Sequence, residues 1–90
     1  MIMGFNTDIE REGVVYHVQT EPRKGAGIET TVYTHGAVIH KLTTSYRELL
    51  NSPDYSDEKA KRMLEDQHRQ IIARIRAGEI VPPASLFPSA

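Results

Sequence analysis

Three of the four histidines of this chain, together with one aspartate, have predicted positions that could support metal or acid–base chemistry. His17 and His40 occupy equivalent positions in two predicted strands, and His68 lies on the apolar stripe of a predicted helix. Three neutral imidazoles can hold zinc with one open position, and Asp8, opposite His17, could orient that ring. The spacing lacks the local signatures of metal sites, such as two histidines one helical turn apart. A polar cross-strand pair between Asp8 and His17 is the simpler interpretation, so we predict no metal and no other cofactor.

The loop over residues 23–27, RKGAG, is a second candidate site. Two cations and the exposed backbone N–H groups of a glycine-rich loop can surround a phosphate or a carboxylate. The segment matches neither a Walker A loop nor a dinucleotide fingerprint, and no predicted helix follows it. Arg23, Lys24 and Gly25 remain an anion-binding candidate, against the alternative of a flexible connection with solubilising charge.

A long amphipathic helix is predicted over residues 56–77. Its apolar stripe falls within one third of the helical wheel and consists of Ala60, Leu64, His68, Ile71 and Ile75. Ser56 can accept a hydrogen bond from a free N–H of the first turn, and Gly78 can adopt the left-handed conformation that ends a helix.

The chain before this helix is predicted to form two β-hairpins, over residues 5–20 and 28–44. They turn at Glu12-Gly13 and His35-Gly36, where glycine accepts the positive φ of a tight turn. A shift of 23 residues superimposes the two hairpins and predicts a structural repeat. The same register pairs Val32 with Ile39. Residues 21–27 are predicted as a loop, because proline cannot donate to a strand ladder.

These elements predict an α+β fold. It is a four-stranded antiparallel meander of two pseudo-repeated hairpins, covered on one face by the long C-terminal helix. The single ββββα domain is expected over residues 1–78, and residues 79–90 are expected to form an extended or disordered tail.

The uncovered sheet face is the predicted interaction surface. An exposed apolar face of this size is typical of a binding surface, and open strand edges offer a second route through strand addition. The alternative is that the segment after the last strand, or the tail, folds back over this face. The leading residues are Val15, Tyr33, Val38, His40 and Leu42.

Composition narrows the classes of function. The chain has 90 residues, a net charge of −1, 39% hydrophobic residues and no cysteine. It can form one core without disulfides or thiolate zinc sites. The near-neutral charge argues against charge-driven binding to membranes or nucleic acids. Its apolar runs are too short to span a membrane, and it carries no nucleophile motif.

Several strings of the sequence carry a resemblance to a group of small, uncharacterised bacterial proteins. They are FNTDI at residues 5–9, G-x-x-YHVQTE at 13–21, IET-x-VY at 28–33, SY at 45–46 and QH at 67–68. The resemblance covers residues 5–78. It implies a bacterial, cytoplasmic origin, and it transfers no functional residue because no activity is attached to the group.

We therefore expect a small cytoplasmic protein–protein interaction or adaptor domain without enzymatic activity. It is expected to be homodimeric and to act through an exposed sheet face or edge. The alternative is a small-ligand or metal-binding domain that uses His17, His40 and the loop over residues 23–27. A third, weaker alternative is nucleic-acid binding along the basic end of the helix.

Overall fold

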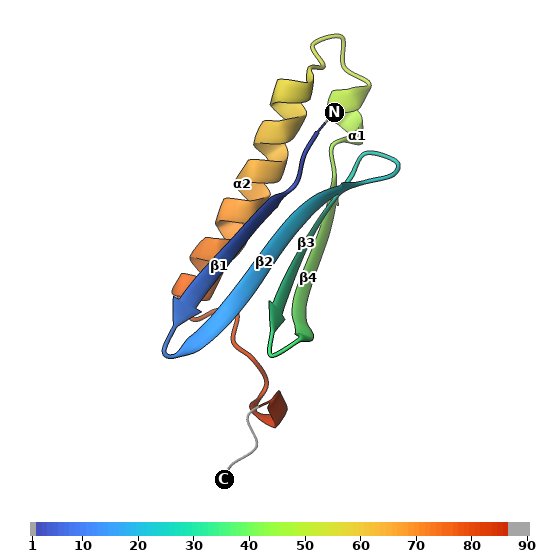
Figure 1. The fold of residues 1–90 in the computed structure, drawn as a ribbon. Coiled ribbons are helices and arrows are strands. Elements are labelled where there is room, and N and C mark those ends of the chain that lie inside the picture. The colour runs from blue at the N-terminus through green and yellow to red at the C-terminus, as the bar shows by residue number, and fades with distance from the viewer. Residues whose placement is uncertain (1, 87–90) are drawn as a thin grey trace.

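The structure is a computed structural model and describes residues 2–86. Four strands form one antiparallel sheet in the order β1-β2-β3-β4, which confirms the predicted α+β class and the β-meander. In chain order the elements are β1 (Phe5–Arg11), β2 (Val14–Arg23), β3 (Gly27–Thr34), β4 (Ala37–Ser45), α1 (Arg47–Leu50), α2 (Asp57–Arg76) and the short 3₁₀ helix η1 (Ala84–Leu86). Figure 1 shows α2 running alongside β1 and β2.

Both hairpin turns lie where the sequence places them. Glu12 and Gly13 have φ values of 52° and 78°, and His35 and Gly36 have values of 50° and 75°. Two successive left-handed residues are typical of the type I′ turn, whose twist matches that of the flanking strands. The glycine at the second position of each turn therefore fixes where the strands begin and end.

β2 continues through Pro22, where the sequence predicted a loop. The Thr34 hydroxyl donates to the Val15 carbonyl at 3.0 Å, so the backbone at Val15 faces β3. Alternation along the strand then directs the nitrogen of Pro22 toward the β1 side. The pairing with β1 ends at Thr20, so no ladder bond needs the missing N–H. The predicted loop over residues 21–27 is reduced to residues 24–26.

A β-bulge shifts β4 out of the predicted register. Val32 pairs with His40, whereas the sequence predicted Ile39 as its partner. The irregularity lies between Val32 and Tyr33, and Ile39 is the extra residue on β4. Because a bulge adds one residue to one strand, every later side chain on that strand changes side. The bulge also makes the second hairpin different from the first, which pairs regularly throughout.

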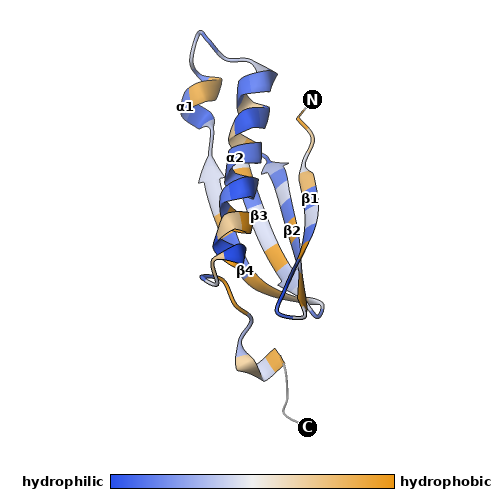
Figure 2. Ribbon diagram, turned by 90° about the vertical axis from the view of Figure 1, so that its left-hand side faces the viewer, coloured by the Kyte–Doolittle hydropathy of each residue, from blue (hydrophilic) through white to orange (hydrophobic). Residues whose placement is uncertain are grey.

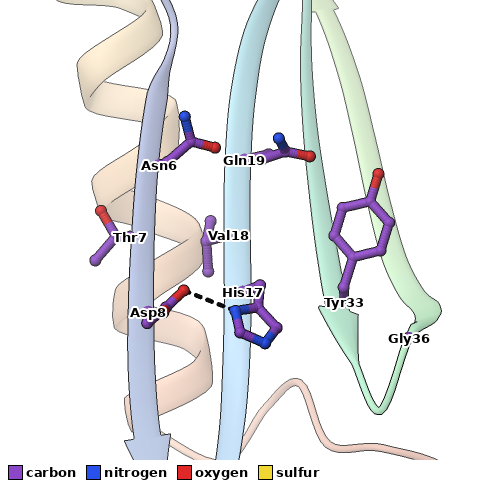
Figure 3. A pocket seen from close by; sticks show the side chains of 8 residues that line it. All are labelled: Asn6, Thr7, Asp8, His17, Val18, Gln19, Tyr33 and Gly36. Carbon is purple, nitrogen blue, oxygen red and sulfur yellow. Dashed lines mark hydrogen bonds and ion pairs between the residues drawn. The ribbon is translucent and has the colours of Figure 1, made fainter.

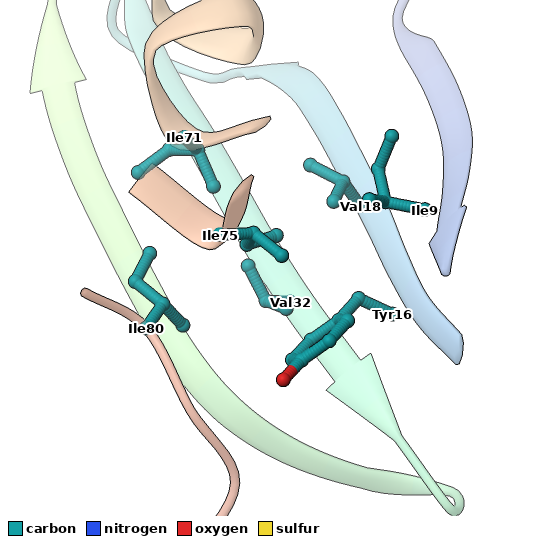
Figure 4. Close-up of a cluster of buried hydrophobic side chains, with 7 residues drawn as sticks. All are labelled: Ile9, Tyr16, Val18, Val32, Ile71, Ile75 and Ile80. Carbon is teal, nitrogen blue, oxygen red and sulfur yellow. The ribbon is translucent and has the colours of Figure 1, made fainter. Parts of the chain in front are cut away.

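The hydrophobic core lies between α2 and the sheet (Figure 4). Two helix residues, Ile71 and Ile75, pack with four strand residues, which are Ile9, Tyr16, Val18 and Val32. We call the side of the sheet that carries these four residues the helix side, and the opposite side the outer side. The helix contacts β2 most, then β1 and β3. The predicted apolar stripe is buried in full, and Gln67 is buried with it.

The ends of α2 also match the prediction. The Ser56 hydroxyl accepts from the Lys59 N–H at 3.2 Å, and Gly78 has a φ of 78°. Figure 2 shows hydrophobic and hydrophilic residues alternating along α2, as expected for a helix with one buried face.

The packed domain extends past its predicted end at residue 78. Ile80 is only 5% exposed and belongs to the core. The chain then runs to η1, and residues 87–90 of the predicted tail lie outside the described part of the chain. Within residues 2–86, no helix is both long enough and apolar enough to cross a membrane.

Candidate functional site

The three candidate histidines do not converge. His17 pairs with Asp8 on the outer side, whereas His40, as the partner of buried Val32, lies on the helix side. His68 is buried under the sheet, on α2. Among residues 2–86 no group of three histidine, cysteine or acidic side chains could hold a metal ion. The alternative site that combines His17 with His40 would need both side chains on one side of the sheet, whereas the bulge places them on opposite sides.

Asp8 and His17 form the predicted polar pair on the outer side. Asp8 Oδ1 lies 2.7 Å from His17 Nδ1, and both residues line a groove of about 430 Å³ with Asn6, Gln19 and Tyr33 (Figure 3). An ionised carboxylate only accepts hydrogen bonds, so the proton lies on Nδ1 and Nε2 is left as an acceptor in the neutral ring. The side chains of His17 and Asp8 are 52% and 69% exposed, so this pair is open to solvent.

A chain of hydrogen bonds joins α2 to all four strands. His68 Nε2 lies 2.8 Å from Thr7 Oγ1, and His68 Nδ1 lies 2.7 Å from Thr20 Oγ1. Thr20 and Thr30 share a bond of 2.7 Å between their hydroxyls, and Gln67 Nε2 donates to Thr30 Oγ1 at 3.0 Å. The Thr44 hydroxyl donates to Gln67 Oε1. We call this set the polar network; its members are Thr7, Thr20, Thr30, Thr44, Gln67 and His68.

The donor and acceptor of each of these bonds can be assigned, because every buried hydroxyl must donate its O–H to an acceptor. Thr30 accepts from Gln67, so its own O–H can be used only by donating to Thr20. Thr20 then donates to His68 Nδ1, and His68 Nε2–H donates to Thr7. This order fixes His68 as the neutral Nε2–H tautomer.

Most of this network was not predicted from the sequence. His68 was expected on the buried stripe, but Thr7, Thr20 and Thr30 had no predicted role. The signal was present, because these threonines alternate with outward residues and share the helix side with Val18 and Val32.

Burial lowers the pKa of His68 below its ordinary value of 6.5. The unfolded chain therefore takes up a proton at His68 near pH 6.5, whereas the folded chain does so only at a lower pH. A proton on Nδ1 would also end its role as acceptor from Thr20. The stability that neutral His68 contributes is present above about pH 6.5 and is lost as the pH falls through its folded pKa.

We expect urea unfolding to show a smaller free energy of unfolding at about pH 5.5 than at about pH 7.5. The matched variant is His68→Gln, which keeps a polar side chain but cannot titrate in this range. Its loss of stability between the two pH values should be smaller than that of the natural chain. Equal losses in both proteins would show that other groups cause the pH dependence.

The two cations of the candidate anion loop do not converge on one site. Arg23 Nη2 lies 3.1 Å from Glu29 Oε1 and 3.4 Å from Glu21 Oε2. The hydrogen bond from Arg23 lowers the pKa of Glu29, and the same bond raises the pKa of Arg23. Arg23 is thus paired along the outer side of β2, and Lys24 is the cation left in the loop. The Gly25 carbonyl accepts from the Arg47 guanidinium at 3.4 Å.

The predicted interaction surface is divided between the two sides of the sheet. Val15, Tyr33 and Val38 lie on the outer side, where Val15 is 42% and Val38 is 52% exposed. His40 and Leu42 lie on the helix side, opposite Val32 and Thr30, because of the bulge. The outer side is therefore less apolar than predicted. His40 Nε2 is buried and has no hydrogen-bond partner.

A second groove, of about 670 Å³, lies between the open edge of β1 and α2. Its apolar lining includes Ile9, Ile72 and Ala73, and it also contains Arg69 and Arg76. We call it the β1–α2 groove. Its two walls come from parts of the chain about 60 residues apart, so no local sequence pattern predicts it.

Comparisons of this chain with protein-family models, with curated proteins and with solved structures found no match. The features of this chain that could bind a partner are the two grooves and the strand edges.

Proposed function

We propose that this chain is a small protein-interaction domain that accepts an extended segment of a partner as a fifth strand beside β1. The observation that carries this proposal is the open edge of β1, which pairs regularly over its whole length and borders the β1–α2 groove. Strand addition uses main-chain hydrogen bonds for affinity and side-chain pockets for specificity, and this edge offers both.

The backbone of β1 presents hydrogen-bonding groups at its open edge. The Val15 carbonyl is turned toward β3, where it accepts from Thr34. Directly paired residues of an antiparallel ladder turn their backbone groups either toward each other or away from each other. Glu10, the partner of Val15, therefore directs its N–H and C=O to the open edge, as do Asp8 and Asn6 at two-residue spacing.

The other edge strand, β4, is guarded. It contains the bulge at Ile39, and Lys41 projects from its outer side to lie 3.6 Å from Glu29. A bulge and a charged side chain, lysine in particular, are two of the features by which natural sheets prevent pairing at their edges. β1 has neither a bulge nor a lysine nor a proline, so it is the edge better suited to accept a strand.

The charges of β1 favour a partner other than a second copy of this chain. Antiparallel self-pairing centred on Asp8 would set this residue opposite itself, and the register shifted by two residues toward the end of β1 would set it opposite Glu10. Like charges directly opposite each other destabilise a strand pair. We therefore replace the expected homodimer with a complex between this chain and a different protein.

Proline at position 8 tests this function. Asp8→Pro removes an N–H from the open edge but none that β2 uses, so the domain should keep its circular dichroism spectrum. The probe is a blocked, neutral heptapeptide of sequence TQTVTQT, titrated into the ¹⁵N-labelled chain. We expect peptide-dependent amide shifts along β1 and α2, and about tenfold weaker binding in Asp8→Pro, from one lost ladder bond and the clash of the ring.

The matched control is Asp8→Ala, which also removes the exposed pair with His17 but keeps the N–H. It should bind the peptide like the natural chain. Equal binding by the proline and alanine variants would rule out strand addition at β1.

A further inference from the structure

We propose that the partner segment is acidic, with two carboxylate side chains on one side of the added strand that pair with Arg69 and Arg76. This inference rests on the proposed function and names the chemistry of its partner. The segment would carry an apolar residue between the two acids and neutral residues on its other side.

The two arginines have the spacing that such a segment requires. They are seven residues apart on α2, which places them on one face and about 10.5 Å apart along the helix axis. Residues on one side of a strand recur about every 6.6 Å. Acids two or four residues apart therefore bracket the distance between the guanidinium groups, and the length of the arginine side chains can cover the difference.

The positive charge of this groove is only partly compensated. Arg69 has one ion pair, with Glu65 at 3.6 Å, and its side chain is 72% exposed. Within residues 2–86 no carboxylate is paired with Arg76. The neighbouring Arg74, by contrast, lies 3.6 Å from Glu79. A chain with a net charge of −1 thus keeps two adjacent cations beside an open strand edge.

The lining between the arginines suits an apolar side chain. Ile9 is 7% exposed, and Ile72 packs against the core with part of its surface open. Ala73 is small and leaves space above them. An aliphatic residue between the two acids would remove this surface from water.

The acidic side chains on the outer side of β1 restrict where the partner segment can carry acids. Asp8 and Glu10 project there, so acidic neighbours on that side would meet like charges. Only the residues that face α2 can be acidic. The segment must therefore alternate, with acids toward the helix and neutral residues such as threonine away from it.

Three blocked heptapeptides, TETVTET, TQTVTQT and TKTVTKT, test this inference with the full chain. We expect the glutamate peptide to bind about fivefold tighter than the glutamine peptide at low salt, as two partly exposed ion pairs allow. The lysine peptide should bind more weakly than both. The advantage of the glutamate peptide should shrink at about 0.5 M salt, where exposed charges are screened.

The double variant Arg69→Gln/Arg76→Gln should lose the preference for glutamate and keep its affinity for the glutamine peptide. The control, Lys61→Gln/Arg62→Gln, changes the net charge equally but alters a different patch of α2, next to Glu58 and Glu65. It should keep the preference.

The outcomes separate this inference from the proposed function. Equal binding of all three peptides, with sensitivity to Asp8→Pro, would overturn the acidic partner and leave strand addition standing. Loss of the preference in both double variants would show a general charge effect and would also overturn the site. Absence of any peptide-dependent shift along β1 would overturn the inference and the proposed function together.

Discussion

Replacement of Thr20 by valine is expected to lower the free energy of unfolding by about 2–4 kcal/mol, because it removes one hydrogen bond from each of two buried polar groups. The Thr20 hydroxyl lies 2.7 Å from His68 Nδ1 and 2.7 Å from the Thr30 hydroxyl. Valine has the same shape but neither donates nor accepts. His68 Nδ1 then lacks its donor, and the Thr30 hydroxyl lacks its acceptor, in a region closed to water. Urea unfolding at neutral pH measures the change.

The matched control is Thr43→Val, because Thr43 is an exposed threonine on β4. Its effect should stay within about 0.5 kcal/mol, as for other surface substitutions. If Thr20→Val were no more destabilising than Thr43→Val, the polar network would not stabilise the fold in the way that its geometry indicates.

Truncation of Ile75 is expected to have the largest effect on stability in this chain. Ile75 is fully buried in the cluster that contains Tyr16, Val32 and Ile80. Ile75→Ala should cost about 2–5 kcal/mol, from lost transfer free energy and from the cavity that remains. In a domain of 90 residues this can be most of the total stability. The urea midpoint, or its absence, gives the result.

Two further variants test whether the effect of Ile75→Ala comes from the loss of buried volume. Ile75→Val removes one methylene and should cost about 0.5–1.5 kcal/mol while the transition stays cooperative. Val81→Ala, at a residue 56% exposed five positions after the end of α2, should be close to neutral. A small loss for Ile75→Ala would mean that α2 does not depend on this contact with the sheet.

Local sequence signals predicted the parts of the fold that local physics determines. Ser56 and Gly78 marked the ends of α2, because capping and left-handed geometry depend only on near neighbours. The glycines at positions 13 and 36 marked both hairpin turns for the same reason. The buried stripe of α2 followed from its spacing alone.

The parts that the sequence did not predict depend on contacts between distant segments. The bulge at Ile39 carries no glycine to mark it, and it alone moved His40 and Leu42 to the helix side. Pro22 fits within β2 only because the pairing with β1 has already ended at Thr20. Neither fact can be read from the residues next to it.

The candidate site also depends on contacts between segments that are distant in the sequence. Open edges were predicted as one route to a partner, but Lys41 on β4 is the one sequence feature used to separate the edges, and it does not identify β1 by itself. The distinction required the position of the bulge and the packing of α2 beside β1. Ile9 and Ile72, which line the same groove, are too far apart in the sequence for their proximity to be inferred from spacing.

The polar network also constrains which amino-acid substitutions this protein can accept during evolution. A single substitution at Thr20, Thr30 or His68 leaves a neighbour unsatisfied, so each first step is deleterious on its own. An apolar replacement of the whole set could restore stability, but it requires several simultaneous changes. These positions should therefore be conserved as a set or replaced as a set. The set joins Gln67 and His68 of the helix to the threonines of the strands.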